Sequence, residues 1–274
     1  MKNKKILLNI FAILLACVFL FPVYWIIISS LKTDSEIFNT PPTFFPKVIT
    51  LKAYTDQLSG DYSIFNGLKN SVVISFSSFL ISMVLAIPAA YGLGRFDVKA
   101  KKTFILSFLI TQMLPVTLLL TPLFLIFKKV HLLNLTLAPI LANCTVAIPF
   151  VVITLRPYFK SLPKSIEEAA TIDGCSSFKT FTSVMIPIAQ SGIVTSGVFS
   201  FLFAWNDLVY SLTFLNSQKA RPLTAGIYNF ISKYGIQWNY IMAFSTLIVI
   251  PVIIIFIFLQ KYIVAGLTSG SIKE

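Results

Sequence analysis

The chain has 274 residues, of which 56% are hydrophobic and only 12% are charged. Soluble domains carry roughly 25% charged residues, so this chain has too few polar side chains to cover a soluble globule. Its high hydrophobicity also excludes a disordered chain. The net charge of +12 comes from cations scattered in short loops, with no basic helix face, so nucleic acid is not expected as a partner. The composition predicts an integral membrane protein.

Six long windows without a charged residue follow one another along the chain. About 20 apolar residues in a helix cross a hydrocarbon core roughly 30 Å thick, and each window is longer than that. None shows the in–out alternation of outer-membrane strands. The sequence predicts a single all-α membrane domain over 1–274, with six transmembrane helices at 6–31, 70–94, 103–127, 132–155, 180–206 and 234–260.

The first window follows Lys2, Lys4 and Lys5, as the apolar region of a signal peptide would. It is too long for such a region, which has 7–15 residues, and no small-residue cleavage site follows it. The window is therefore predicted to stay in the membrane as an anchor.

Lysine and arginine predict the orientation. With the N-terminus inside, 13 of the 22 basic residues fall on inner segments, and four of them lie within 95–102. Because basic residues favour the cytoplasmic side, both termini are predicted to be cytoplasmic. The segment 32–69 is then a folded outer loop, and 156–179 is a long cytoplasmic connection.

Prolines lie within or at the ends of most windows. They suit hinges in a moving transporter, but proline is also common in membrane helices, so the hinge interpretation stays open. They are Pro22, Pro88, Pro115, Pro122, Pro139, Pro149, Pro187 and Pro251.

Neither catalysis nor metal binding is supported by the residue inventory. The chain lacks a phosphate-binding loop, a zinc-protease motif and a nucleophile elbow. Its single histidine, His131, has no carboxylate nearby to orient it, and the three cysteines have no metal-ligand spacing. We expect no catalytic residue, no metal and no cofactor bound by this chain. Ion-coupled pumping is also disfavoured, because carboxylates are missing from the windows.

The cytoplasmic connection contains a short predicted helix at 165–174. Ser165 and Glu168 fit a capping box, and Gly174 fits the left-handed position that ends a helix. Ile166, Ala169, Ala170 and Asp173 share one small, apolar face edged with charge. Ser176 or Ser177 begins a second helix bearing Phe178, Phe181 and Met185, and Pro187 marks the bend into the fifth window. This unit is either a docking surface for another protein or a capped connector, and the residues alone leave both open.

Three motifs resemble one known family. The first is the EAA signature of ABC importer permeases. The second is a W-N-[DE] region, and the third is a C-terminal signature at 260–270. The residues that carry the first two are Glu168, Ala169, Ala170, Asp173, Gly174 and Pro187, and then Trp205, Asn206 and Asp207. Taken together, the chain resembles the permease subunits of maltose-type ABC sugar importers over essentially its whole length. Cys175 departs from the alanine common in that family.

The resemblance implies the ABC type I importer permease fold and several partners. These are a second homologous permease, two cytoplasmic ATPase subunits that bind ATP and Mg, an extracytoplasmic solute-binding protein and a sugar. Residues of the EAA signature, with Pro187, would couple the permease to an ATPase, and the tail at 266–274 would be a second contact. Trp205, Asn206 and Asp207 are candidates for the substrate pathway.

Three alternatives remain at this point. One is a permease of the same family for another solute, such as a glycerol phosphate or a polyol. Another is an ion-coupled secondary transporter, and the third is a membrane enzyme. The absence of cationic residues from the windows favours a neutral sugar over a phosphorylated solute.

Overall fold

The computed structural model describes residues 2–58, 63–232 and 235–269. These residues form helices and one short two-stranded hairpin, in which β1 and β2 pair antiparallel. In chain order the elements are α1 (Lys2–Ser30), α2 (Asp34–Ile37), α3 (Lys52–Thr55), α4 (Ile64–Arg95), α5 (Lys101–Met113), α6 (Val116–Lys129), α7 (Leu137–Ser161), α8 (Ser165–Ile172), α9 (Ser177–Thr180), a π-helical turn (Phe181–Met185), α10 (Ile186–Ile188), α11 (Gln190–Trp205), α12 (Val209–Phe214), a 3₁₀ turn (Gln218–Ala220), α13 (Leu223–Gly226), a 3₁₀ turn (Ile227–Phe230), β1 (Ile231–Ser232), β2 (Gly235–Ile236) and α14 (Trp238–Ser269).

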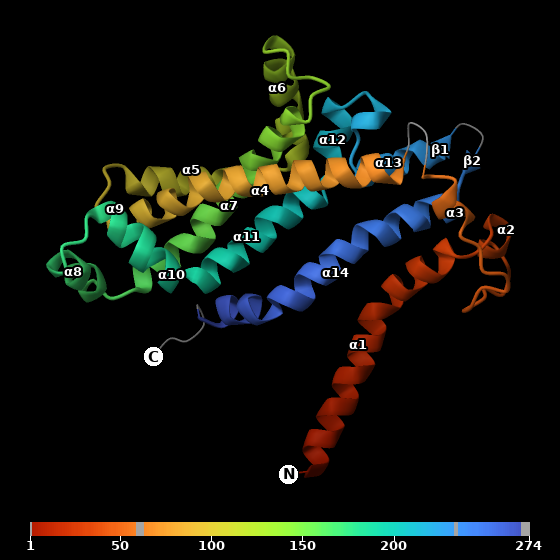
Figure 1. Ribbon diagram of the computed structural model, residues 1–274, viewed down its shortest axis with the longest axis horizontal. Coiled ribbons are helices and arrows are strands. Elements are labelled where there is room, and N and C mark those ends of the chain that lie inside the picture. The colour runs from red at the N-terminus through yellow and green to blue at the C-terminus, as the bar shows by residue number, and fades with distance from the viewer. Residues whose placement is uncertain (1, 59–62, 233–234, 270–274) are drawn as a thin grey trace.

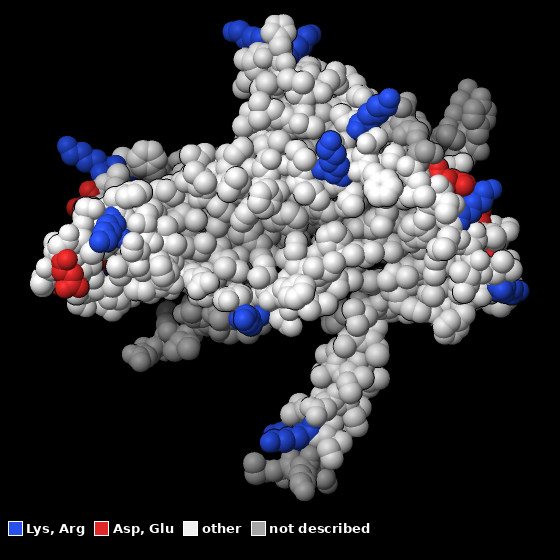
Figure 2. Space-filling model, in the orientation of Figure 1, with Lys and Arg blue, Asp and Glu red and all other residues white. Residues whose placement is uncertain are grey.

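Within the described residues, four helices are long and apolar enough to cross a membrane on their own: α1, α4, α7 and α14. Two bent helix pairs bring the number of candidate spans to as many as six if each pair counts as one. The largely helical architecture predicted from composition is confirmed. On the face drawn in Figure 2, acidic side chains lie near the two ends of the long axis, whereas basic side chains also lie along its middle.

The third predicted span, 103–127, is not one helix. The structure has α5 and α6, which meet at an angle of 103°. Leu114 and Pro115 between them are extended, with ψ of 129° and 138°. A residue before proline is driven out of the helical region by the proline ring, and proline has no N–H to continue the helix. Figure 1 shows α6 projecting away from the line of α5.

The fifth predicted span, 180–206, is also broken. The segment Ser177–Ile188 meets α11 at 80°, and the break lies at Ala189. Pro187 removes one helical donor, and the preceding turn, Phe181–Met185, is π-helical. Loss of that donor and a π-turn are both known causes of helix bends. The bend that the sequence assigned to Pro187 is therefore present, two residues further on.

Other span limits differ from the predicted ones because local backbone geometry sets them. The fourth span begins at Leu137 and not at 132, because His131 and Asn134 have positive φ values of 57° and 65°, which are not helical. The second begins earlier, at Ile64, and includes Lys69.

The core of the bundle lies between α4, α7 and α11, which run side by side along the long axis (Figure 1). The face of α4 toward this core carries small buried serines, which let helix backbones approach closely in a membrane. Ser78 illustrates the contact, because its hydroxyl donates a hydrogen bond of 3.2 Å to the carbonyl of Ile140 in α7. The serines of this face are Ser71, Ser75, Ser78 and Ser82.

Helix α1 leaves this bundle. It packs along α14 and then points away from the rest of the chain (Figure 1). None of its most apolar window is buried within the chain.

The described residues of the segment 32–69 are folded, as predicted. Glu36 is buried, and its carboxylate accepts hydrogen bonds of 2.8 Å from the Thr43 hydroxyl and from the Lys47 N–H. A hydrogen bond of 2.8 Å from the Tyr240 hydroxyl to Asp56 attaches the segment to α14. This end of the molecule lies opposite α8 (Figure 1).

Candidate coupling site

Helix α8 ends as its sequence predicts. Gly174 has φ of +79°, in the left-handed region that favours glycine. The Gly174 N–H donates to the Thr171 carbonyl at 3.0 Å, and the Cys175 N–H donates to the Ala170 carbonyl at 2.9 Å. This pair of bonds is the Schellman motif, which satisfies the last carbonyls of the helix.

The capping box predicted for the start of α8 is not formed. The helix is capped by Lys164, whose side chain makes no capping bond, and Ser165 is already its first residue. The Lys164 carbonyl accepts the Glu168 N–H at 3.1 Å, so this donor is satisfied by the backbone. Glu168 is therefore free of the capping role and is exposed.

The four residues predicted to share one face of α8 are divided between two. Ile166 packs on the core cluster of α4 and α7, and Ala170 is 6% exposed. The outward face carries Glu168, Ala169, Ile172, Asp173 and Gly174. Among the predicted coupling residues on α8, Ala170 therefore lies on the inward face of the helix.

Two large apolar side chains of α8 and α9 are strongly exposed. Ile172 is 86% exposed and Phe178 is 76% exposed. A large exposed apolar side chain next to charged ones is typical of a protein-binding surface. The sequence analysis missed Ile172. Its position one turn after Glu168, on a helix too short to bury two faces, was the available signal.

The neighbouring Glu167 points inward, to α4. Arg95 Nε donates to Glu167 Oε2 at 2.7 Å, and its Nη2 forms an ion pair with the same oxygen. The Tyr91 hydroxyl donates to Glu167 Oε1 at 2.8 Å. Partial burial acts to raise the pKa of Glu167, but these hydrogen bonds and the charges of Arg95 and Lys164 outweigh it and hold its pKa below the usual value. Glu167 is therefore a carboxylate at neutral pH.

Helix α9 begins as predicted, with Ser176 as its cap. The Ser176 hydroxyl accepts a hydrogen bond of 3.3 Å from the Lys179 N–H. Pro187 lies beyond α9, in α10, and not on α8. Residues 270–274 of the predicted tail contact lie outside the described residues, while 266–269 belong to the end of α14.

The three predicted substrate-pathway residues differ in their surroundings. Trp205 is 2% exposed, and its Nε1 donates to the Ile248 carbonyl of α14 at 3.0 Å. Asp207 is 8% exposed and accepts hydrogen bonds from the N–H groups of Tyr210 and Ser211, both at 3.0 Å, which caps α12. Of the three, Asn206 is the exposed one.

Replacing Asp207 by alanine is expected to destabilise the folded chain by roughly 2 kcal/mol, because the start of α12 loses its cap and three buried donors, including the Ser211 hydroxyl, lose their acceptor. The purified protein should show a lower Tm in a thermal unfolding experiment. Asn206→Ala, at the exposed neighbour, is the control and should leave Tm near its original value. Equal Tm values for Asp207→Ala and the original protein would contradict the capping role.

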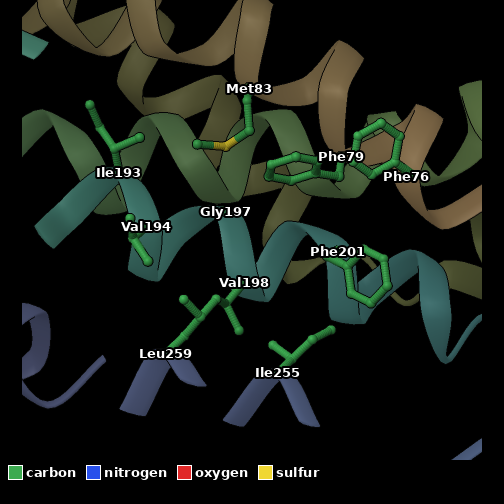
Figure 3. Close-up of a pocket in the computed structure, with 10 residues that line it drawn as sticks. All are labelled: Phe76, Phe79, Met83, Ile193, Val194, Gly197, Val198, Phe201, Ile255 and Leu259. Atoms are coloured by element: carbon green, nitrogen blue, oxygen red, sulfur yellow. The ribbon is translucent and has the colours of Figure 1, made fainter. Parts of the chain in front are cut away.

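A pocket of about 420 Å³ opens between α4, α11 and α14. Figure 3 shows its lining, and the described side chains that form it carry no hydroxyl, amide or charged group to bind a hydroxyl-rich solute. Specific recognition of a sugar requires such polar groups, so this pocket is not suited to it. It is lined by Phe76, Phe79, Met83, Ile193, Val194, Gly197, Val198, Phe201, Ile255 and Leu259.

The fold and the motifs both correspond to one known family. Residues 82–269 match the model of the binding-protein-dependent transport system inner membrane component, and the chain belongs to this family. It is thus a multi-pass membrane permease.

Curated relatives cover nearly the whole chain. The chain is 33% identical over 272 residues to the trehalose/maltose transport system permease protein MalG of Thermococcus litoralis, covering 98% of this chain and 97% of that one. It is 29% identical over 265 residues to the diacetylchitobiose uptake system permease protein DasC of Streptomyces coelicolor, covering 97% and 96%.

The fold is shared with a solved transporter. A chain in the crystal structure of a bacterial ABC transporter involved in the import of the acidic polysaccharide alginate matches with a TM-score of 0.78. Its sequence identity to this chain is 21%, and the match covers 96% of this chain and 98% of that one. This likeness supports the ABC importer permease fold predicted from the sequence.

Proposed function

We propose that this chain is the permease subunit of an ATP-driven, binding-protein-dependent importer of oligosaccharides, working by alternating access. ATP binding would close two cytoplasmic ATPase subunits, α8 would carry their movement into the permease, and the helices would change between two packings. Such packings need to differ by only a few kcal/mol.

The exposed face of α8 is the observation that carries this proposal. The helix stands at one end of the long axis (Figure 1) and offers Glu168, Ala169, Ile172 and Asp173 to a partner. Small, acidic and apolar side chains on a helix with a capped C-terminal end favour insertion into a groove of another protein. A simple connector has no need of an isoleucine that is 86% exposed.

The proposed assembly contains a second, homologous permease, two ATPase subunits that bind ATP and Mg, and an extracytoplasmic solute-binding protein. The apolar surface of α1 that the rest of the chain leaves unburied can face lipid or the second permease. With α8 on the ATPase side, the segment 32–69 faces outward and both termini are cytoplasmic, in agreement with the basic residues at 95–102.

An oligosaccharide is proposed as the solute because the names of several relatives refer to transport of such compounds. They include diacetylchitobiose, trehalose/maltose and arabinooligosaccharides. Within this chain we assign a solute-facing role to Asn206 alone among the three pathway candidates, because Trp205 and Asp207 are buried and already hydrogen-bonded. An exposed amide suits a sugar hydroxyl.

The proposal is tested by reconstituting the complete importer into vesicles and measuring uptake of a labelled oligosaccharide. Uptake should require ATP on the cytoplasmic face and should persist in the presence of a proton ionophore. The permease purified alone should hydrolyse no ATP. Uptake driven by an ion gradient without ATP would contradict the proposal and favour a secondary transporter.

A further inference from the structure

The inward face of α8 is connected to the membrane helices by a small polar cluster. It consists of Tyr91 and Arg95 at the end of α4 and Glu167 on α8. Arg95 also reaches α7, because its Nη1 donates to the Leu162 carbonyl at 2.7 Å and to the Phe159 carbonyl at 3.3 Å. One guanidinium therefore joins three elements, the ends of α4 and α7 and the helix α8.

The cluster is held in a defined geometry. The Arg95 side chain is 5% exposed and that of Glu167 is 23% exposed, so both charges are largely shielded from water. The Tyr91 ring packs edge-on against Phe159 of α7 and lies 4.8 Å, centre to centre, from the ring of Phe181. Charge-assisted hydrogen bonds to a planar guanidinium fix orientation as well as distance.

A pocket of about 190 Å³ lies between α8, α9 and the end of α4, and Tyr91, Arg95 and Glu167 form part of its lining. Its lining includes Thr171, Ser177 and Thr180, and the Thr180 hydroxyl is buried without a hydrogen-bond partner among the described residues. The side of α8 that borders this pocket is not held by close packing. The polar cluster, with the Ile166 contact, therefore sets the position of α8 relative to α4.

Helix α4 extends from this cluster to the opposite end of the molecule without a break (Figure 1). At that end Asn70 Nδ2 donates to the Lys219 carbonyl at 2.7 Å, and the Ser71 hydroxyl accepts the Leu223 N–H at 2.9 Å. A shift of α4 would therefore displace the segment that leads into α13.

We propose that Tyr91, Arg95 and Glu167 form a coupling latch, which transmits movement of α8 to α4 and α7. The three residues are positioning residues. They do not bind the ATPase or the solute, but they make the membrane helices follow α8. This inference rests on the proposed function, in which the ATPase subunits move α8.

Loss of the latch is expected to lower the sugar transported per ATP without releasing the ATPase subunits. Loss of a docking residue would lower both the transport and the binding of the ATPase subunits. Without the latch, α8 still presents its outward face, so the ATPase subunits stay bound and hydrolyse ATP. The movement no longer reaches α4 in full, so less sugar is transported for each ATP hydrolysed. A merely structural role would instead lower the amount of assembled importer without changing this ratio.

The test uses the complete reconstituted importer and measures three readouts: bound ATPase subunit, ATP hydrolysis and sugar transported per ATP. Glu167→Gln keeps the shape of the side chain and removes its charge. It is expected to retain the ATPase subunits and to lower sugar per ATP by about tenfold, a typical size for coupling between sites. Tyr91→Phe keeps the packed ring, removes one hydrogen bond and should lower the ratio by about threefold.

Asp97→Asn is the matched control, because Asp97 is an exposed carboxylate two residues after Arg95. It should leave all three readouts unchanged. Unchanged sugar per ATP in both Glu167→Gln and Tyr91→Phe would overturn the latch, as would loss of the ATPase subunits from Glu167→Gln. Failure of the original importer to retain any ATPase subunit would instead contradict the proposed function.

Discussion

Replacing Ile172 by aspartate is expected to release the ATPase subunits from the importer while the permease remains in the membrane at its normal level. Ile172 is 86% exposed, so the substitution costs the isolated chain little. In the proposed assembly this side chain is buried against the ATPase, and an aspartate there would be an unpaired charge in the interface. We expect a loss of affinity of about thirtyfold or more, as for a binding hot spot.

Copurification of the ATPase with the tagged permease measures this loss. Val98→Asp is the matched control, because Val98 is an exposed apolar residue in the loop after α4. It should retain the ATPase. Glu168→Lys, which reverses an exposed charge on the same face of α8, should also weaken copurification. Full retention of the ATPase by both α8 variants would make the helix a connector and not a docking surface.

The second large effect is expected at Gly192 in α11. A β-carbon at this position would lie 2.8 Å from the Tyr158 ring of α7, closer than real contacts allow. Gly192→Leu should therefore force α11 away from α7 and destabilise the chain by about 3 kcal/mol or more.

The amount of intact chain in the membrane and the Tm of the purified protein both measure this destabilisation. Gly92→Leu is the matched control, since a β-carbon at Gly92 in α4 meets no atom within 4 Å. Its Tm should stay close to that of the original chain. Equal Tm values for Gly192→Leu and Gly92→Leu would contradict the close contact between α7 and α11.

Composition and charge placement were enough to predict the continuous membrane helices. A membrane excludes charged side chains, so uncharged windows reveal α1, α4, α7 and α14 directly. The end of α8 was predictable for a similarly local reason, because few residues other than glycine adopt the φ of +79° found at Gly174.

The two broken spans were not predictable from proline alone. Pro88, Pro149 and Pro251 lie inside helices that continue past them, whereas the Leu114–Pro115 pair is extended and α5 ends there. Neighbouring helices can satisfy the groups that a proline frees, so the outcome depends on tertiary contacts.

The inward and outward faces of α8 also depend on distant residues. Glu167 and Glu168 are equivalent in the local sequence, and the sequence analysis selected Glu168. Arg95, 72 positions before Glu167, is the residue that turns Glu167 inward. Trp205 and Asp207 also depend on other segments. Trp205 is hydrogen-bonded to α14 and Asp207 to α12, so both have structural roles that their residue types alone do not reveal.

The most direct test of the docking claim places a photoreactive amino acid at position 172 of the permease in the complete importer. After irradiation, the crosslinked partner is identified by mass spectrometry. We expect a crosslink from position 172 to the ATPase subunit, and none from position 166 on the inward face. A crosslink from position 172 to lipid or to the permease itself, with none to the ATPase, would show that α8 does not dock on the ATPase.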